Sequence, residues 1–353
     1  MAGSGFGTNF RITTWGETHG AGVGVVVDGC PAGLPLERED VQKYLDRRKP
    51  GQSKYTTQRK EGDQVEILSG IFEGRTTGTP ISMVVYNKDQ RSKDYSNIKD
   101  IYRPGHADFT FDMKYGFRDY RGGGRSSGRE TIGRVAAGAV AAKVLKELGI
   151  EIKAYAKAIA GIEVSKDHFD FAEMNNNPFN MPDKEAAKLV QEKADQMIKE
   201  MDSIGGIIEC QIKGMPVGIG ETVFDKLDAE LSKAIMSIGS VKGFEIGDGF
   251  EAANLRGSEN NDDFICVDGK VEKETNHSGG VLGGMSDGSA IVFRAAIKPT
   301  PSIAQTQKTV NRDLDNVEIE IHGRHDPMIV PRAVVVVESM AAVTILDGVL
   351  KNL

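Results

Sequence analysis

The sequence carries one stretch rich in both glycine and arginine, RGGGRSSGRETIGR at residues 121–134. Three consecutive glycines let backbone N–H groups face a ligand with no side chain between them. Ser127 and Glu130 have the S-x-x-E spacing of a capping box, which predicts that a helix begins there. A helix N-terminus favours anions, and forked guanidinium donors suit phosphate or carboxylate. We therefore predict an anion-binding loop whose cations are Arg121, Arg125, Arg129 and Arg134. The alternative is a surface turn with solvated arginines, although so glycine-rich a turn is costly to order.

Two of the six histidines lie in glycine-containing loops and could transfer protons. His19 lies in GETHG at 16–20, and His106 lies in RPGHAD at 103–108, two residues before a carboxylate. Histidine changes its charge near neutral pH, which suits general acid–base chemistry. A lone histidine is more often structural, but neither of these lies on an apolar face. We predict a role in the site for both.

The second half of the chain contains further loops that could hold a ligand. They expose backbone or combine cations with hydroxyl groups, and they lie at 239–243, 276–284, 298–302 and 323–327. None of them is specific by itself. The last one places Arg324, His325 and Asp326 in consecutive positions.

Apolar periodicity and turn residues predict the elements that position these loops. The patterns predict two strands within 9–27, a hairpin within 65–86, helices over 37–48, 135–142, 183–201 and 225–238, a strand over 333–337 and a helix over 339–350. Arg47 and Arg48 end the first helix, where cations also favour the helix dipole, so their position alone does not indicate a site.

Glycine spacing indicates an internal repeat. Three glycines and an isoleucine of the first hairpin recur at a constant offset of 210 residues; the pairs are Gly70 and Gly280, Gly74 and Gly284, Gly78 and Gly288, and Ile81 and Ile291. The motif G-x-P-x-G also occurs twice, at 29–33 and 214–218. We predict one domain over 1–353, with similar halves at 9–150 and 203–353 about a pseudo-two-fold axis. A helical insertion would lie near 165–202.

Composition excludes several classes of function. The net charge of −7 argues against a nucleic-acid-binding protein, which normally has a basic face. The three cysteines are isolated, which predicts no disulfide framework and, with no aspartate cluster or H-E-x-x-H, no metal site. No P-loop or dinucleotide-binding fingerprint is present. The start lacks the features of a signal peptide, and no apolar run reaches the roughly 18 residues of a membrane span. We expect a cytoplasmic protein that binds a small anionic substrate, neither a nucleic acid nor a membrane.

Taken together, these segments resemble the chorismate synthase family over essentially the whole chain. The matching motifs are GETHG at 16–20, DRR at 46–48 with YTTQR at 55–59, RPGHAD at 103–108, RGGGRSS at 121–127, KPT at 298–300 and GRHDP at 323–327. Two residues depart from the usual family pattern. Thr18 stands where Ser is usual and keeps the hydroxyl, and Gly128 stands where Ala is common.

The resemblance implies the last enzyme of the shikimate pathway. The family converts 5-enolpyruvylshikimate 3-phosphate to chorismate by a 1,4-anti elimination of phosphate, and it requires reduced FMN without net redox change. NADPH acts as an indirect reductant in some members. The implied fold is α+β, a β-α-β sandwich with helices between two antiparallel sheets, assembled as a homotetramer.

The resemblance also implies roles for single residues. His19 would protonate the departing phosphate, His106 would hold or protonate the flavin, and Asp326 with Ser127 would manage the proton on flavin N5. Family positions that bind FMN match Arg125, Ser126, Ser127, Gly239, Ser240, Gly283, Lys298, Pro299, Thr300, Pro301, Ser302 and Arg324. Positions that bind substrate or NADP match Arg48, Lys54, Arg129 and Arg134, with Arg47 and Arg59 as lesser candidates.

Two other functions are compatible with the same loops. A flavin-dependent oxidoreductase would transfer electrons with net redox change, but the missing dinucleotide fingerprint weighs against a built-in nicotinamide domain. A non-catalytic anion-binding protein would use the glycine loops without needing the histidines or Asp326.

Overall fold

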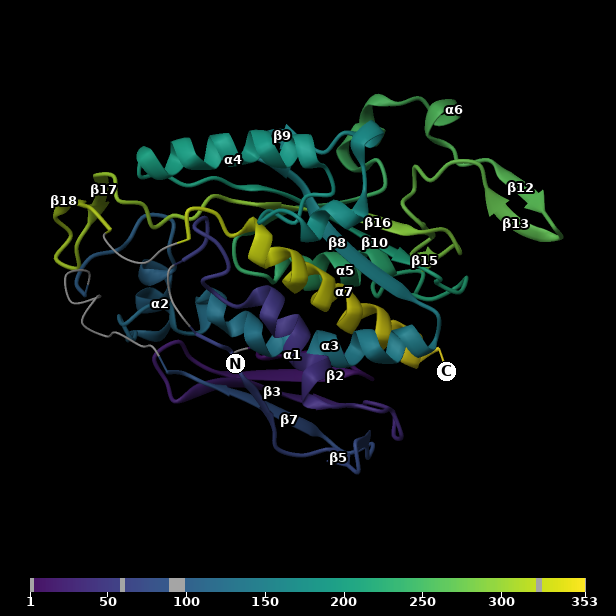
Figure 1. The fold of residues 1–353 in the computed structure, drawn as a ribbon, viewed down its shortest axis with the longest axis horizontal. Coiled ribbons are helices and arrows are strands. Elements are labelled where there is room, and N and C mark those ends of the chain that lie inside the picture. The colour runs from purple at the N-terminus through teal and green to yellow at the C-terminus, as the bar shows by residue number, and fades with distance from the viewer. Residues whose placement is uncertain (1–2, 58–60, 89–98, 322–325, 353) are drawn as a thin grey trace.

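The computed structural model describes residues 3–57, 61–88, 99–321 and 326–352. It is an α+β structure with two five-stranded sheets and helices between them (Figure 1). The first sheet has the order β1-β2-β3-β7-β4, and the second has the order β11-β16-β10-β8-β9. Neighbouring strands in both sheets are antiparallel.

The elements have the following bounds. The first sheet contains β1 (Gly5–Phe6), β2 (Arg11–Gly16), β3 (Gly22–Asp28), β4 (Val65–Ile67) and β7 (Ile81–Tyr86). The second contains β8 (Glu151–Ile159), β9 (Ile162–Glu163), β10 (Gly206–Lys213), β11 (Val241–Ile246) and β16 (Ile291–Ile297). Short strand pairs are β5 (Ile71–Phe72) with β6 (Arg75–Thr76), β12 (Phe264–Val267) with β13 (Lys270–Lys273), β14 (Val281–Leu282) with β15 (Met285–Ser286), and β17 (Gln307–Val310) with β18 (Asn316–Ile319). The α-helices are α1 (Arg38–Arg48), α2 (Asp108–Tyr115), α3 (Thr131–Glu147), α4 (Lys184–Lys199), α5 (Leu227–Met236), α6 (Gly257–Asn260) and α7 (Val330–Lys351).

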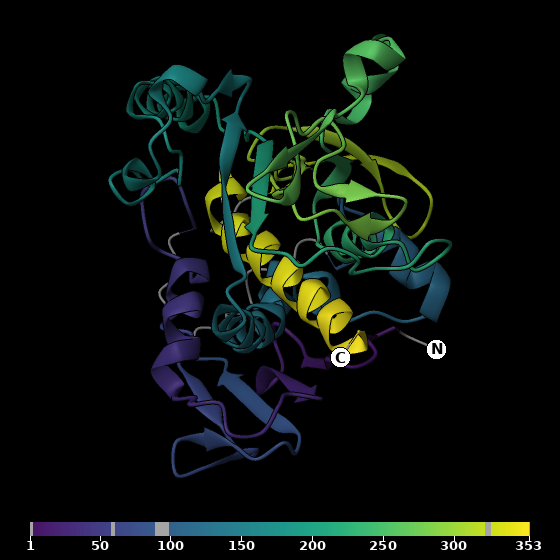
Figure 2. The same ribbon diagram turned by 90° about the vertical axis from the view of Figure 1, so that its right-hand side faces the viewer.

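Helices α3 and α7 form the middle of the structure. Helix α3 packs on β3 of the first sheet, α7 packs on β8 and β10 of the second, and the two helices pack on each other (Figure 2). Their contact is close because Gly138 has no side chain: a Cβ atom there would lie 2.2 Å from Cβ of Ser339. The run of small residues in α3, VAAGAVAA at 135–142, therefore allows the close approach of α3 and α7.

The predicted strand over 333–337 is wrong, since these residues belong to α7. Their run of valines favours a strand by propensity, but burial of the helix between α3 and the second sheet overrides that preference. Splitting this segment into a strand and a helix also hid its length. Contrary to the expectation that no apolar run is long enough, α7 could cross a membrane by length and composition. In this structure, 83% of its apolar window is buried inside the protein, as in a core helix.

The predicted capping box at the start of α3 is also wrong. The hydroxyl of Ser127 accepts from the N–H of Arg129 and caps a short 3₁₀ turn, Gly128–Glu130, so α3 begins at Thr131. The carboxylate of Glu130 turns to other partners: it accepts from the Thr14 hydroxyl at 2.8 Å and from Nε of Arg134 at 2.9 Å. Helix α2 had no prediction.

The hairpins β5–β6 and β14–β15 lie at the predicted offset of 210 residues. Their first glycines, Gly70 and Gly280, both have φ of +83°, and each packs against the isoleucine that begins the next long strand. A side chain at either position would be strained, which explains glycine in both.

We expect Gly138→Ala to destabilise the fold by about 1–3 kcal/mol through overpacking at the helix crossing. Chemical denaturation would measure this free energy of unfolding. Gly257→Ala in α6 is the control, because its Cβ would meet nothing within 4 Å. Alanine ordinarily favours helix over glycine, so equal stability of the two variants would contradict the packing argument.

Candidate functional site

The His19 loop lies against the glycine-rich loop that precedes α3. Arg125 donates to the carbonyl oxygens of Thr14 and Gly16, both at 3.1 Å, and the hydroxyl of Thr18 lies 3.5 Å from the carbonyl oxygen of Gly124. Arg125 therefore fixes the end of β2, from which the His19 loop leaves. The structure brings these two predicted segments together although they are more than 100 residues apart.

The His106 loop meets the segment 298–302. Nε2 of His106 lies 2.7 Å from the hydroxyl of Ser302, and Nζ of Lys298 donates to the carbonyl oxygen of Gly105 at 2.8 Å. The hydroxyl of Ser203 holds the same segment by donating to the carbonyl oxygen of Thr300 at 2.6 Å. A histidine, a hydroxyl and a cation are thus collected in one place.

Residues 237–240 connect these two groups of loops. The carbonyl oxygen of Ser240 accepts from the N–H of Lys298 at 2.9 Å. The hydroxyl of Ser237 accepts from Arg134 at 2.6 Å, and Gly239 faces the backbone of Ser126. The predicted segments at 121–134, 239–240 and 298–302 are therefore contiguous in space.

Two predicted substrate-binding arginines share one buried carboxylate. Asp63 accepts from Arg48 at 3.1 Å and from Arg129 at 2.9 Å, and its side chain is fully buried. Arg129 also pairs with Glu61. Burial lowers the pKa of Arg48 to about 10; Asp63 opposes this, while the nearby Arg332 and Arg129 add to it. A cation in such surroundings would gain from a further anion.

Asp326 lies at the edge of this charged cluster. Its carboxylate accepts from the N–H of Thr57 at 2.8 Å and from Arg332 at 2.7 Å. Arg332 in turn donates to the carbonyl oxygen of Arg48 at 3.0 Å. Asp326 therefore connects the start of α7 to the loop after α1, and Arg332 connects α7 to the end of α1.

Other predicted site residues lie apart from these contacts. Nζ of Lys54 pairs with Asp195 of α4 at 2.8 Å, and its side chain is 61% exposed. Gly283 lies in the turn of the β14–β15 hairpin. Arg47 is held by Glu338 of α7 through two hydrogen bonds. Arg59 and Arg324 lie outside the described residues.

Several residues in or beside the charged cluster of Arg48, Asp63, Arg129, Glu61, Asp326 and Arg332 were not predicted from the sequence. Asp63 and Glu61 follow the basic loop after α1, and Asn87 directly follows the apolar strand β7. Polar residues at strand boundaries were the available signal for these three. Arg332 directly precedes the segment wrongly predicted as a strand, and no sequence signal marked it. Within the part of the chain that the structure describes, no group of three or more His, Cys, Asp or Glu side chains could hold a metal ion.

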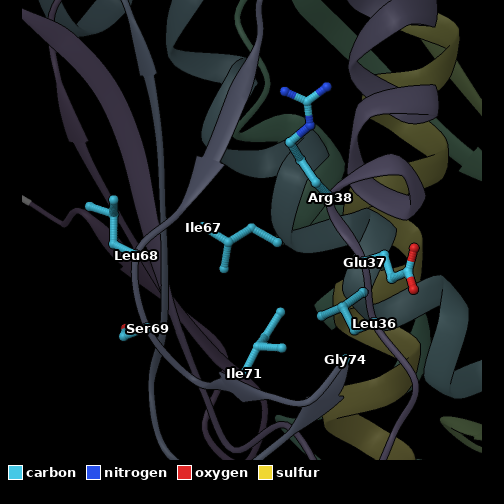
Figure 3. Close-up of a pocket in the computed structure, with 8 residues that line it drawn as sticks. All are labelled: Leu36, Glu37, Arg38, Ile67, Leu68, Ser69, Ile71 and Gly74. Atoms are coloured by element: carbon cyan, nitrogen blue, oxygen red, sulfur yellow. The ribbon is translucent and has the colours of Figure 1, made fainter.

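A cavity of about 430 Å³ lies elsewhere, between the start of α1 and the hairpin that follows β4. The side chains of Leu36, Ile67 and Ile71 face its interior (Figure 3). It includes none of the predicted site residues. Its lining is largely apolar, and its two charged residues, Glu37 and Arg38, have opposite signs. Such a lining does not suit a multiply anionic ligand, so we place the candidate site at the loops before α3 and α7.

The fold of the His106 loop depends on a buried ion pair. Asp108 accepts from Nε of Arg103 at 2.7 Å and from its terminal nitrogen at 2.8 Å, and Arg118 lies 3.4 Å away. Burial would raise the pKa of Asp108, but the hydrogen bonds from Arg103 and the charge of Arg118 lower it below its usual value. This carboxylate is thus committed to holding the loop.

We expect the Arg103–Asp108 ion pair to make the free energy of unfolding depend on pH in the acid range. Because the pKa of Asp108 is lower in the folded chain, its contribution is complete above about pH 4 and is lost as the pH falls through the folded-state value. Asp108→Asn should cost about 3–5 kcal/mol at neutral pH and flatten the acid limb of a plot of unfolding free energy against pH. Parallel curves for parent and variant would contradict this assignment.

Comparison with known proteins identifies the family. The family model described as chorismate synthase matches residues 10–350. Chorismate synthases from Lachnospira eligens and Agathobacter rectalis are 68% and 65% identical, each over 100% of this chain and 96% of the relative. A crystal structure of chorismate synthase superposes with a TM-score of 0.79 at 31% identity, covering 99% of this chain and 93% of the other. The chain therefore belongs to the chorismate synthase family.

Proposed function

We propose that this chain converts 5-enolpyruvylshikimate 3-phosphate to chorismate and phosphate at the junction of the loops before α3 and α7. The substrate carries two carboxylates and a phosphate, so it needs a concentration of cations within an acidic protein. The observation that carries the proposal is the contact of the His106 loop with 298–302, beside the glycine-rich loop and Gly239–Ser240. Cations, hydroxyls and exposed backbone converge there.

The residues present fit reduced FMN, which when bound would supply an electron to the substrate transiently without net redox change. Among the described residues, the hydroxyl of Thr300 is buried and has no hydrogen-bond partner, so it could bind a polar ligand atom. Lys298 and Arg125 would bind the phosphate of FMN. Backbone groups of 126–127 and 239–240 and the segment 299–302 would surround the cofactor. Gly283 and Arg324 remain predictions for this role, as does NADPH as an indirect reductant.

The histidines would handle protons at the substrate and cofactor. Protonated His19 would donate to the leaving phosphate oxygen, beside the guanidinium of Arg125. His106 would turn its ring nitrogen from Ser302 toward the flavin and hold it. Asp326 would accept the proton at flavin N5. Ser127 would assist it, because its hydroxyl accepts from the N–H of Arg129 and keeps its own hydrogen to donate.

Arg48, Arg129, Arg134 and Lys54 remain the proposed groups for the substrate's anions or NADP. Arg48 has the strongest support, because it is buried near two other cations. Lys54 would have to leave Asp195, which its exposed position allows. Fixed donors in a water-poor site would stabilise the developing charge on phosphate.

We further propose a pseudo-two-fold relation between the halves, cytoplasmic location and a homotetramer. The strand order β2-β3-β7-β4 in the first sheet has a counterpart, β8-β10-β16-β11, in the second. This matching order and the repeated hairpins support the first proposal. The other two follow from family membership alone.

We expect phosphate release from 5-enolpyruvylshikimate 3-phosphate only when FMN is chemically reduced. The measurement is anaerobic phosphate release with reduced, oxidised or no FMN. Adding NADPH to oxidised FMN then tests for built-in reduction. Stoichiometric consumption of reduced FMN would indicate an oxidoreductase, and FMN binding without any release would leave only an anion-binding protein.

We expect His19→Ala and His106→Ala each to lower kcat by about 10²–10⁴, the usual contribution of a positioned acid or base. Both side chains lie in loops, so the temperature of unfolding should change little. Steady-state phosphate release under reducing conditions gives kcat, and circular dichroism checks the fold. Near-normal turnover of either variant would remove the role assigned to that histidine.

A further inference from the structure

Asn87 holds the loop that carries His19. Its side-chain amide donates to the carbonyl oxygens of Glu17 at 2.9 Å and Gly20 at 2.8 Å, one on each side of His19. Its backbone N–H donates to the carbonyl oxygen of Ala21 at 3.0 Å. A single residue directly after β7 therefore makes three hydrogen bonds to this loop, at residues 17, 20 and 21.

Asn87 is itself held by Arg129. Nε of Arg129 donates to the side-chain oxygen of Asn87, and the rest of the guanidinium pairs with Asp63 and Glu61. Arg129 is buried, and these partners fix the orientation of its guanidinium. The amide of Asn87 is consequently fixed at its oxygen by a buried cation and presents both amide hydrogens to the His19 loop.

We propose that Asn87 is a positioning residue, which sets the place of His19 relative to the substrate. The inference rests on the proposed role of His19. The loop contains glycines at 16 and 20, and such backbone has many alternative conformations unless hydrogen bonds restrict it. The two amide hydrogens of Asn87, one on each side of the histidine, provide that restriction. A general acid requires placement to within about 1 Å or less.

Asparagine suits this position for a chemical reason. The oxygen must accept from Arg129 while the nitrogen donates twice. Aspartate would keep the acceptor for Arg129 but would present a second oxygen to two carbonyl oxygens, and both loop hydrogen bonds would be lost. Glutamine would keep all three functions on a longer side chain.

The test compares Asn87→Asp with the parent by two independent measurements. We expect kcat for phosphate release with reduced FMN to fall about a hundredfold with little change in KM, because misplacing a reacting group mainly lowers turnover. Hydrogen exchange, followed by mass spectrometry without substrate, should become faster at residues 16–21. Asn87→Gln should recover part of both losses.

Asn177→Asp is the matched control. Asn177 likewise donates to two backbone carbonyl oxygens, of Glu173 at 2.6 Å and Met181 at 2.8 Å, in a loop that contains none of the proposed site residues. This variant should show faster exchange around 173–181 and unchanged kcat. A comparable loss of kcat in both variants would overturn a specific role for Asn87.

The outcomes separate this inference from the proposed function. If His19→Ala abolishes turnover while Asn87→Asp changes neither kcat nor exchange at 16–21, the positioning role is wrong and the function of His19 stands. If His19→Ala is active but exchange at 16–21 still rises in Asn87→Asp, the loop contact is real and the role of His19 is wrong; the positioning role then fails with it.

Discussion

The close packing of α3 on α7 is the constraint on which the rest of the structure depends. Each helix covers a different sheet, so their separation sets the distance between the two sheets. Gly138 against Ser339 makes that separation small. The same packing places the N-termini of α3 and α7 at one end of the molecule, beside α2 (Figure 1). Helix N-termini carry unpaired N–H groups, so this end is suited to anions before any side chain is considered.

The charged side chains at this end are preorganised before any ligand binds. Asp63 joins Arg48 from α1 to Arg129 from the 3₁₀ turn before α3, and Asp326 joins Arg332 from α7 to the loop after α1. Burying such groups unpaired would be very unfavourable, so each is paired and hydrogen-bonded. The pairing limits their freedom. Donors that are already oriented need little reorganisation when charge develops on a substrate, which is the main requirement for electrostatic catalysis.

Local patterns predicted most of the elements, and the failures have physical causes. The helices at 37–48 and 225–238 and the strands within 9–27 agree with α1, α5, β2 and β3. The strand predicted over 333–337 failed because burial on every side makes a valine run acceptable in a helix. The capping box at Ser127 failed because Glu130 found stronger partners in Thr14 and Arg134. In both cases a tertiary contact decided between two locally reasonable conformations.

The sequence by itself determined the chemistry that is available: histidines in glycine-containing loops, a glycine- and arginine-rich segment, and family motifs along the whole chain. Only the tertiary structure decided how each group is used. Asp63 and Arg129 are 66 residues apart, and Asn87 reaches a loop about 70 residues before it. Motif spacing describes neighbours within a few residues, whereas these contacts depend on how the strands pair and how α3 and α7 pack. Whether an arginine is committed to a carboxylate or available to a ligand is therefore a property of the folded chain.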